Sequence, residues 1–247
     1  MGKDIKKILI LNGTPRANES TTILVTKAFV DGIVSESKAE VEYINLNDLN
    51  IKPCLGCLSC WGRTEGECVI KGDDIEMMKR KILEADIFIE SYQLFFFGMP
   101  GMMKVFTDRM LSMLKTYRGQ KSPVNGESFH GIRNEIVPKF VVITSCAYTE
   151  FGPVYEPLIK QYDCICGKNN YLMLFAPQLK TLISLKNEAK IKKHLSKFYD
   201  AGKEYALNDL KLSDETYELL KKPPFSEGAY KIFLDNFWKE EKEKGTK

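Results

Sequence analysis

The segment KILILNGTPRANESTTIL at residues 7–24 restricts the possible folds of this chain more than any other stretch. Its apolar run from Ile8 to Leu11 has the length and branched content of a strand buried on both faces. Gly13 and Pro15 then favour a tight bend, and from Thr21 onward apolar residues return at helical spacing. A strand, a turn and a helix N-terminus in direct succession predict the first unit of an α/β fold.

The loop between this strand and this helix is rich in hydroxyl groups and predicts an anion site. Free N–H groups at a helix N-terminus attract anions, hydroxyls add donors, and Arg16 adds a positive charge. The loop has neither the Gly-Lys-Ser/Thr of a Walker loop nor a GxGxxG fingerprint, whereas flavodoxin-like folds hold a phosphate monoester in a loop of this kind. An ordinary strand–helix turn with a Ser or Thr cap is the alternative. The candidate hydroxyls belong to Thr14, Ser20, Thr21 and Thr22.

Strand-like and helical patterns alternate along the rest of the chain. This alternation predicts a five-stranded parallel sheet with helices on both faces. Together with the hydroxyl-rich first loop, it leads us to expect a flavodoxin-like, doubly wound sheet. Ligands of such sheets lie beyond the carboxyl ends of the strands, so we expect the loops at 13–22, 91–101 and 144–152 to meet. Further strands are expected at 41–46, 86–90, 139–144 and 171–175, with helices at 75–85, from Met102, at 151–166 and at 186–207.

The length of 247 residues suits one domain with an appendage. We expect residues 1–207 to form the flavodoxin-like, ligand-binding domain and residues 208–247 to form a helical C-terminal extension. The last helix of this extension, at 226–244, is suited to packing either on its own subunit or on a partner chain. Its apolar stripe consists of Tyr230, Phe233, Leu234 and Phe237.

Charge and hydropathy exclude several classes of partner. The net charge is +3 with acidic and basic residues interleaved, which argues against nucleic-acid binding. No apolar run reaches membrane-spanning length, and MGKDIKK leads directly into a strand. We therefore expect a cytoplasmic protein without a signal peptide or membrane anchor.

Two segments resemble the NADPH-dependent FMN reductase family. GTPRANESTTIL is similar to the family's phosphate loop GSPRxxSxTxxL, and the segment from Gly98 to Arg109 matches its flavin loop SPVYxxGMPGxLKxFIDR. Tyr92 stands where the family has Pro, and one extra residue precedes Gly98. The resemblance extends over roughly residues 7–180.

The resemblance implies an FMN oxidoreductase that takes electrons from NAD(P)H and passes them to a quinone, nitro, flavin or other small acceptor. It also implies a homodimer or homotetramer with the flavin near a subunit interface. No general acid or base is expected, because the cofactor carries the hydride chemistry, and His130 and His194 are expected to be packed or solvent-facing. The implied contacts are Thr14, Arg16, Ser20 and Thr21 at the phosphate; Leu94, Phe95, Phe96, Phe97, Gly98 and Met99 along the ring; and Ser145, Cys146, Tyr148 and Gly152 at its other side.

The three consecutive phenylalanines at 95–97 cannot all point inward on a loop. Part of this aromatic surface is therefore expected to face a ligand or a partner.

Four of the seven cysteines fall within fifteen residues, which indicates metal or redox chemistry rather than a disulfide framework. Their spacing resembles that of the iron–sulfur flavoproteins, a branch of the same fold, and implies a [4Fe–4S] cluster and an electron-carrier function. Zinc and metal-free thiols are the alternatives, and a module that has lost its flavin is a third functional hypothesis. The four are Cys54, Cys57, Cys60 and Cys68; of the other three, Cys146 lies on a predicted ligand loop and Cys164 and Cys166 are expected in the core.

Overall fold

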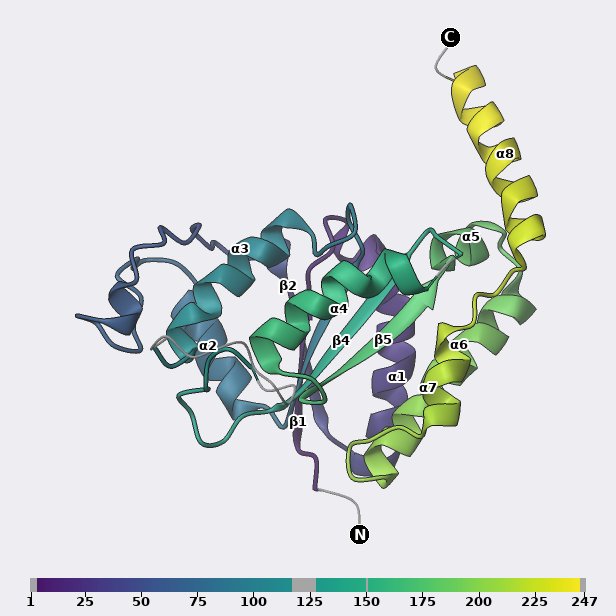
Figure 1. The fold of residues 1–247 in the computed structure, drawn as a ribbon. Helices are drawn as coiled ribbons and strands as arrows, with labels where there is room; N and C mark the ends of the chain where they lie inside the picture. Colours follow the sequence, from purple (N-terminus) through teal and green to yellow (C-terminus); the bar gives the residue numbers. More distant parts are fainter. Residues whose placement is uncertain (1–3, 117–127, 150, 245–247) are drawn as a thin grey trace.

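A five-stranded parallel sheet with the strand order β2-β1-β3-β4-β5 forms the centre of the protein (Figure 1). The computed structural model describes residues 4–116, 128–149 and 151–244, except for the side chain of Asn18. This strand order confirms the predicted flavodoxin-like fold, and it reverses between β1 and β3, where such folds bind their ligands. The strands are β1 (Lys7–Asn12), β2 (Glu40–Asn45), β3 (Ile87–Gln93), β4 (Lys139–Cys146) and β5 (Tyr171–Pro177).

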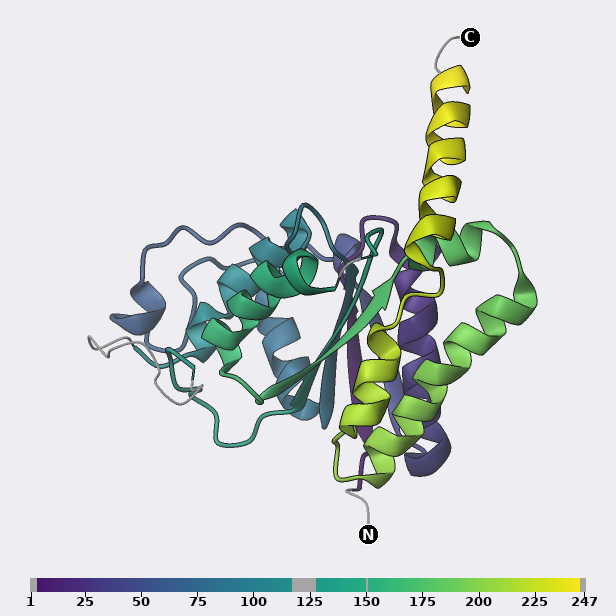
Figure 2. The same ribbon diagram turned by 45° about the vertical axis from the view of Figure 1, so that its right-hand side comes forward.

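Helices cover both faces of the sheet (Figure 2). Helices α1, α5, α6 and α7 pack on one face, and α2, α3 and α4 pack on the other. Along β1, Ile8 and Ile10 belong to the first core cluster while Leu9 and Leu11 belong to the second, which explains the continuous apolar run. The helices are α1 (Thr22–Ser37), α2 (Ile75–Glu84), α3 (Gly101–Arg109), α4 (Gly152–Cys166), α5 (Leu179–Ser184), α6 (Glu188–Leu207), α7 (Asp214–Lys221) and α8 (Glu227–Lys244).

Two glycines let α1 and α6 cross in backbone contact. A Cβ atom on Gly32 would lie 2.0 Å from the carbonyl oxygen of Tyr199, and one on Gly202 would lie 1.9 Å from that of Phe29. This crossing fixes α1 against α6, and both helices pack on the sheet through the same core cluster. The loop that precedes the N-terminus of α1 is thereby held at the carboxyl edge.

Within the described ranges, no helix combines the length and the apolar character needed to cross a membrane.

Candidate functional site

The loops that follow β1 and β3 are each hydrogen-bonded at their first residue to the end of the neighbouring strand, which brings the loops after β1, β3 and β4 side by side at the carboxyl edge of the sheet. The N–H of Gly13 donates to the carbonyl of Ser91 at 2.9 Å, and the N–H of Leu94 donates to the carbonyl of Ser145 at 2.7 Å. The predicted meeting of these three loops is confirmed. One ligand at this edge has access to residues from all of them.

The loop after β1 is held in shape by two polar contacts, one buried and one at the surface. The Thr14 hydroxyl lies 3.0 Å from the side-chain oxygen of Asn12, to which it donates. The side-chain amide of Asn47, in the short 3-10 helix η2 (Leu46–Asp48), donates to the carbonyl of Pro15 at 2.9 Å. The two asparagines brace the loop from β1 and from the segment after β2, and sequence reasoning did not single them out.

The predicted phosphate contacts differ in their exposure. Arg16 is exposed, while Thr21 is half-buried as the N-cap of α1 and makes no side-chain capping hydrogen bond. Ser20 is buried, and its hydroxyl oxygen accepts a hydrogen bond from the N–H of Thr22 at 3.2 Å. Thus Thr14 and Ser20 shape the loop from within, and Arg16 and Thr21 lie nearer its surface.

Two buried hydroxyl pairs join α1 to the ends of the strands. The hydroxyl oxygens of Thr22 and Ser145 are 2.6 Å apart, and those of Thr26 and Ser91 are 2.7 Å apart. All four residues are buried. Ser145 therefore braces α1, and Thr26 and Ser91 form a second brace that the sequence analysis missed.

The loop after β3 makes a tight turn with two exposed aromatic residues at its tip. Phe95 and Gly98 exchange two backbone hydrogen bonds of 2.9 Å. Phe96 and Phe97 have φ angles of +47° and +66°, a left-handed conformation that costs about 1–2 kcal/mol per L-residue. Asn-Gly is the usual choice for such a turn, so the strain points to a function for the aromatic side chains.

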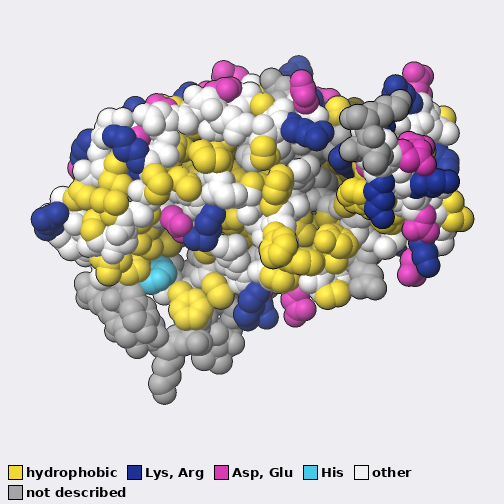
Figure 3. Space-filling view, turned by 90° about the horizontal axis from the view of Figure 1, so that it is seen from above, with side chains coloured by type: hydrophobic (Ala, Val, Ile, Leu, Met, Phe, Trp, Pro, Cys, Tyr) yellow, Lys and Arg dark blue, Asp and Glu magenta, His cyan; other side chains and the backbone are white. Residues whose placement is uncertain are grey.

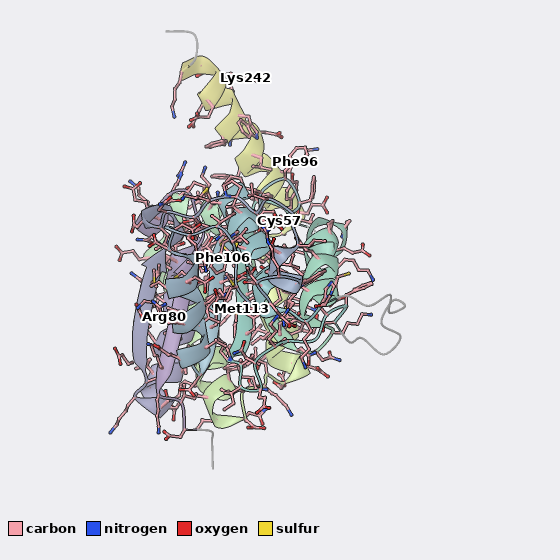
Figure 4. All side chains as sticks on the ribbon, turned by 90° about the vertical axis from the view of Figure 1, so that its left-hand side faces the viewer. Cys57, Arg80, Phe96, Phe106, Met113 and Lys242 are labelled. Atoms are coloured by element: carbon pink, nitrogen blue, oxygen red, sulfur yellow. The ribbon has the colours of Figure 1, made fainter. Side chains whose placement is uncertain are left out.

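Tyr148, from the loop after β4, extends this aromatic surface. Its ring stacks on that of Phe97 with a centroid separation of 5.7 Å and an interplanar angle of 26°. Phe96 is fully exposed and Tyr148 is half exposed. Figure 3 views this end of the molecule and shows hydrophobic side chains gathered on it, and Figure 4 labels Phe96 there. We name Phe95, Phe96, Phe97 and Tyr148 the aromatic patch.

The remaining predicted ring contacts lie deeper or further along the chain. Met99 and Cys146 are buried, Leu94 is half-buried, and Gly152 is exposed as the first residue of α4. The thiol of Cys146 accepts a hydrogen bond from the N–H of Tyr148 at 3.4 Å. Burial raises the pKa of Cys146, so this thiol stays neutral at physiological pH.

The cysteine-rich segment is anchored to α3 through Arg109. The Arg109 guanidinium pairs with the Asp73 carboxylate at 2.5 Å and donates to the carbonyls of Lys52 at 2.7 Å and Ile70 at 3.5 Å. Both side chains of the ion pair are almost completely buried. Burial alone would raise the pKa of Asp73, but hydrogen bonds from Arg109 and from the N–H of Lys52 lower it overall. Arg109 thus ties both ends of the segment that carries the cysteines.

The four clustered cysteines are free thiols near one another. Cys57 is exposed, and the other three are half-buried. Burial, together with the neighbouring thiols of Cys68, Cys54 and Cys57, raises the pKa of Cys60. Over the described ranges, however, no group of three or more His, Cys, Asp or Glu side chains is arranged to hold a metal ion. Four thiolates are the donor set of such a cluster, but the structure does not group them for one, so the cluster stays a prediction.

A buried carboxyl–tyrosine chain lies beneath the aromatic turn. Tyr162 donates to the Glu90 carboxylate at 2.5 Å, and the hydroxyl oxygens of Tyr162 and Tyr92 are 2.7 Å apart. Burial raises the pKa of Glu90 to about 7, although the Tyr162 hydrogen bond opposes the shift. Tyr92, which stands where the family has Pro, is therefore part of this buried chain.

A cavity of about 1490 Å³ lies between α3 and α4. Its lining includes Phe88, Glu90 and Tyr162. Among the described residues, no member of the 13–22 loop lines it, so the cavity is separate from the three-loop site.

Together the sheet order and the position of these loops define a flavodoxin-like protein. A model of the NADPH-dependent FMN reductase family matches residues 6–129, about half of the sequence, and the chain belongs to this family.

Relatives and solved structures agree with this assignment. An iron–sulfur flavoprotein of Methanocaldococcus jannaschii is 35% identical over 103 residues, or 42% of this chain and 51% of that protein. An FMN-dependent NADH:quinone oxidoreductase of Exiguobacterium is 31% identical over 121 residues, or 45% of this chain and 57% of that protein. The match thus spans about half the length of these curated relatives. An FMN-dependent NADH-azoreductase of Bacillus anthracis, solved with FMN, shares the fold with a TM-score of 0.54 at 18% identity, covering 82% of this chain and all of that one.

Replacing Arg109 tests the anchor of the cysteine segment. Arg109→Met leaves the buried Asp73 carboxylate without its partner, so we expect the free energy of unfolding to fall by about 3–5 kcal/mol in urea denaturation. The double variant Arg109→Met/Asp73→Asn should lose less than the sum of the two single variants. Lys104→Met is the matched control, because the Lys104–Asp108 pair is about half exposed and should contribute at most about 1 kcal/mol. Equal losses for Arg109→Met and Lys104→Met would contradict the anchoring role.

Glu90 predicts a specific dependence of stability on pH. Its pKa is about 7 in the folded protein against an ordinary value of 4.5, so the unfolded chain ionises first as the pH rises. The contribution of Glu90 to the free energy of unfolding is therefore fully present below about pH 4.5, decreases between about pH 4.5 and 7, and does not change further above pH 7. The loss is roughly 3 kcal/mol.

The measurement compares urea denaturation of the wild type and Glu90→Gln at about pH 5 and about pH 8. Glu90→Gln should be less sensitive to pH than the wild type, whereas the control Glu84→Gln, at an exposed carboxylate, should follow the wild type. Parallel profiles for the wild type and Glu90→Gln would show that Glu90 is not the titrating group.

Proposed function

We propose that this protein is an FMN-dependent oxidoreductase that takes reducing equivalents from NAD(P)H and passes them to a small acceptor such as a quinone, a nitro compound or a free flavin. One observation carries the proposal: the hydroxyl-lined loop at the N-terminus of α1 is hydrogen-bonded through Gly13 to the end of β3, and the loop that directly follows β3 carries exposed aromatic residues. The names of the relatives, including an NADH:quinone oxidoreductase, support it. In this proposal residues 1–207 are the FMN-binding domain and residues 208–247 the helical extension.

The residues at the first loop suit a phosphate dianion. Arg16 and Thr21, nearer the surface, would bind it with the N–H groups of α1, while Thr14 and Ser20 would keep the loop in its binding shape. The N-terminus of α1 favours negative charge at the same point. This assignment divides the four predicted phosphate residues into two that contact the ligand and two that position the loop.

The residues at the other two loops suit a flat aromatic ring. The backbone of residues 94–99 would border the ring, and Phe97 and Tyr148 offer a stacked aromatic wall between the two loops. Gly152 is the first residue of α4, which begins shortly after Tyr148 in the chain. FMN, when bound, supplies the hydride chemistry, and the protein binds, orients and shields it. Ser145 and Cys146 would support the site from below, since both are buried.

Neither histidine lies where a general acid or base would be needed. His194 is buried on α6, and burial lowers its pKa to about 4. The ring of His130 packs against Trp61 at 4.8 Å, beside the cysteine segment. The proposal accordingly assigns no proton transfer to a histidine.

The direct test is the absorption spectrum of the purified protein. We expect flavin bands that bleach when NADH or NADPH is added under anaerobic conditions and return when a quinone is supplied. A colourless protein that does not bind added FMN would refute the proposal and favour a module that has lost its flavin.

The phosphate assignment predicts a selective effect of Arg16. Removing a charge-assisted hydrogen bond with Arg16→Met should weaken FMN binding about tenfold or more, measured by fluorescence titration of the flavin-free protein. Riboflavin lacks the phosphate, so its affinity should be unchanged. Lys6→Met, at an exposed lysine just before β1, controls for net charge and should affect neither ligand. Equal weakening of both flavins by Arg16→Met would place Arg16 away from the phosphate.

A second candidate function is that of an iron–sulfur flavoprotein electron carrier. It rests on the spacing of Cys54, Cys57, Cys60 and Cys68 and on the name of the Methanocaldococcus jannaschii relative. A [4Fe–4S] cluster requires about four iron and four sulfide per chain in anaerobically purified protein. That result would favour the carrier; protein with flavin but without iron and sulfide would exclude it.

A further inference from the structure

Helix α8 leaves the body of the protein and is attached at its base (Figures 1 and 2). At that base, Tyr230 is buried and its hydroxyl donates to the carbonyl of Ala147, in the loop after β4. In Figure 4 the label of Lys242 lies towards the tip of the helix, and Phe96 lies at the end of the molecule from which α8 projects. The projecting helix therefore starts beside the aromatic patch, because Ala147 directly precedes Tyr148.

The projecting part of α8 carries an apolar stripe. Phe233 stacks on Tyr230 at 6.4 Å and on Phe237 at 6.2 Å, and Trp238 lies edge-on to Phe237 at 5.0 Å and is 57% exposed. In the described parts of the chain, neither core cluster includes any residue of the stripe, although Tyr230 is itself buried at the base of the helix. A large aromatic stripe of this kind marks an interaction surface.

The charges on α8 decide which partner suits the stripe. Helices that lie on membranes are rich in Lys and Arg on their polar face, and nucleic-acid surfaces are strongly basic. Helix α8 instead carries five acidic and four basic residues, interleaved, which suits a surface complementary to itself. The acidic residues are Glu227, Asp235, Glu240, Glu241 and Glu243, and the basic residues are Lys231, Lys239, Lys242 and Lys244.

We propose that α8 pairs with α8 of a second copy of this chain, antiparallel, about a two-fold axis near Leu234. Leu234 lies midway between Tyr230 and Trp238, so this axis places the Trp238 end of one helix beside the Tyr230 end of the other. Glu227 in the first turn of one helix then lies beside the last turns of the other, which carry Lys242 and Lys244 next to Glu241, and the two helix dipoles are antiparallel.

The size of this contact is adequate for a specific dimer. An 18-residue helix is about 27 Å long, so the pair together with adjoining surface buries on the order of 1,000 Å². Because each arm starts beside its own aromatic patch, its tip reaches towards the patch of the other copy. The approach of the tip to the other patch matters for the proposed function only if that patch borders the flavin. The pairing of the two helices does not depend on the proposed function.

The mass in solution and one charged substitution test the pairing. By light scattering, the wild type should have twice the chain mass of 28.2 kDa, and Phe237→Glu should have half the mass of the wild type, with unchanged circular dichroism. Ile232→Glu is the matched control, because Ile232 is 65% exposed and lies about 140° around the helix from Phe237. A monomeric wild type, a dimeric Phe237→Glu, or dissociation of the Ile232→Glu control would each overturn the proposal.

A cysteine on the two-fold axis tests the orientation of the helices. In Leu234→Cys, two copies of the same thiol meet across the axis, and mild oxidation by copper phenanthroline should join them as a disulfide. Lys239→Cys, on the opposite side of α8, is the control and should cross-link no faster than the wild type with its native thiols. A pair that dissociates with Phe237→Glu yet does not cross-link through Leu234→Cys would refute the antiparallel register. Both measurements are independent of flavin, so a colourless protein that dimerises through α8 would refute the proposed function and leave this inference standing.

Discussion

The hydrogen bond from the Gly13 N–H to the Ser91 carbonyl holds together the ends of the two strands between which the strand order reverses. The rest of the site depends on this junction. A Cβ atom at Gly13 would lie 2.2 Å from the sulfur of Met103, so the absent side chain lets α3 pack directly over the loop. Helix α3 in turn ends at Arg109, which ties down the cysteine segment. Helix α3 therefore packs on Gly13 in the candidate phosphate loop and, through Arg109, also holds the cysteine segment.

Buried polar groups add to the apolar packing of α1 on the sheet by joining this helix to the strand ends. Four hydroxyl groups form two short pairs that join α1 to β3 and β4. Each pair satisfies polar atoms that would otherwise be costly to bury. Such pairs also hold the loops in one register, which a site that must grip both ends of one mononucleotide requires. Ser145, which the resemblance predicts as a ring contact, is one member of these pairs and so also braces α1.

The aromatic turn and α8 both expose large apolar side chains at the same end of the molecule. Phe96 and Phe97 adopt left-handed backbone conformations that most turns assign to Gly or Asn. The chain tolerates this backbone strain. It also keeps an exposed apolar stripe on α8, whose first turns are hydrogen-bonded through Tyr230 to Ala147 in the loop after β4. We infer that both features serve contacts outside the subunit, one with a planar ligand and the other with a second copy of the chain.

The sequence by itself determined the flavodoxin-like class, the alternation of strands and helices, and the meeting of three loops at one edge. These properties follow from local patterns: an apolar run buried on both faces predicts a central parallel strand, and Gly13 before a hydroxyl-rich helix start predicts an anion loop. The exposure of part of the phenylalanine triplet was also predictable, since neighbouring loop residues cannot all point inward. Short helix α5 was not predicted, because six residues carry too little periodicity.

Only the tertiary structure decided which side chains meet across long separations in the chain. The Arg109–Asp73 pair, the chain from Tyr92 through Tyr162 to Glu90, and the contact of Tyr230 with Ala147 join residues 36 to 83 positions apart. No local pattern encodes such pairs, because they depend on how helices pack on the sheet. The spacing of the cysteines likewise suggested a metal centre, and the structure shows no metal-holding group among the described residues, so that centre stays a prediction. Spacing fixes which residues are near in the chain, and packing fixes the directions in which their side chains point.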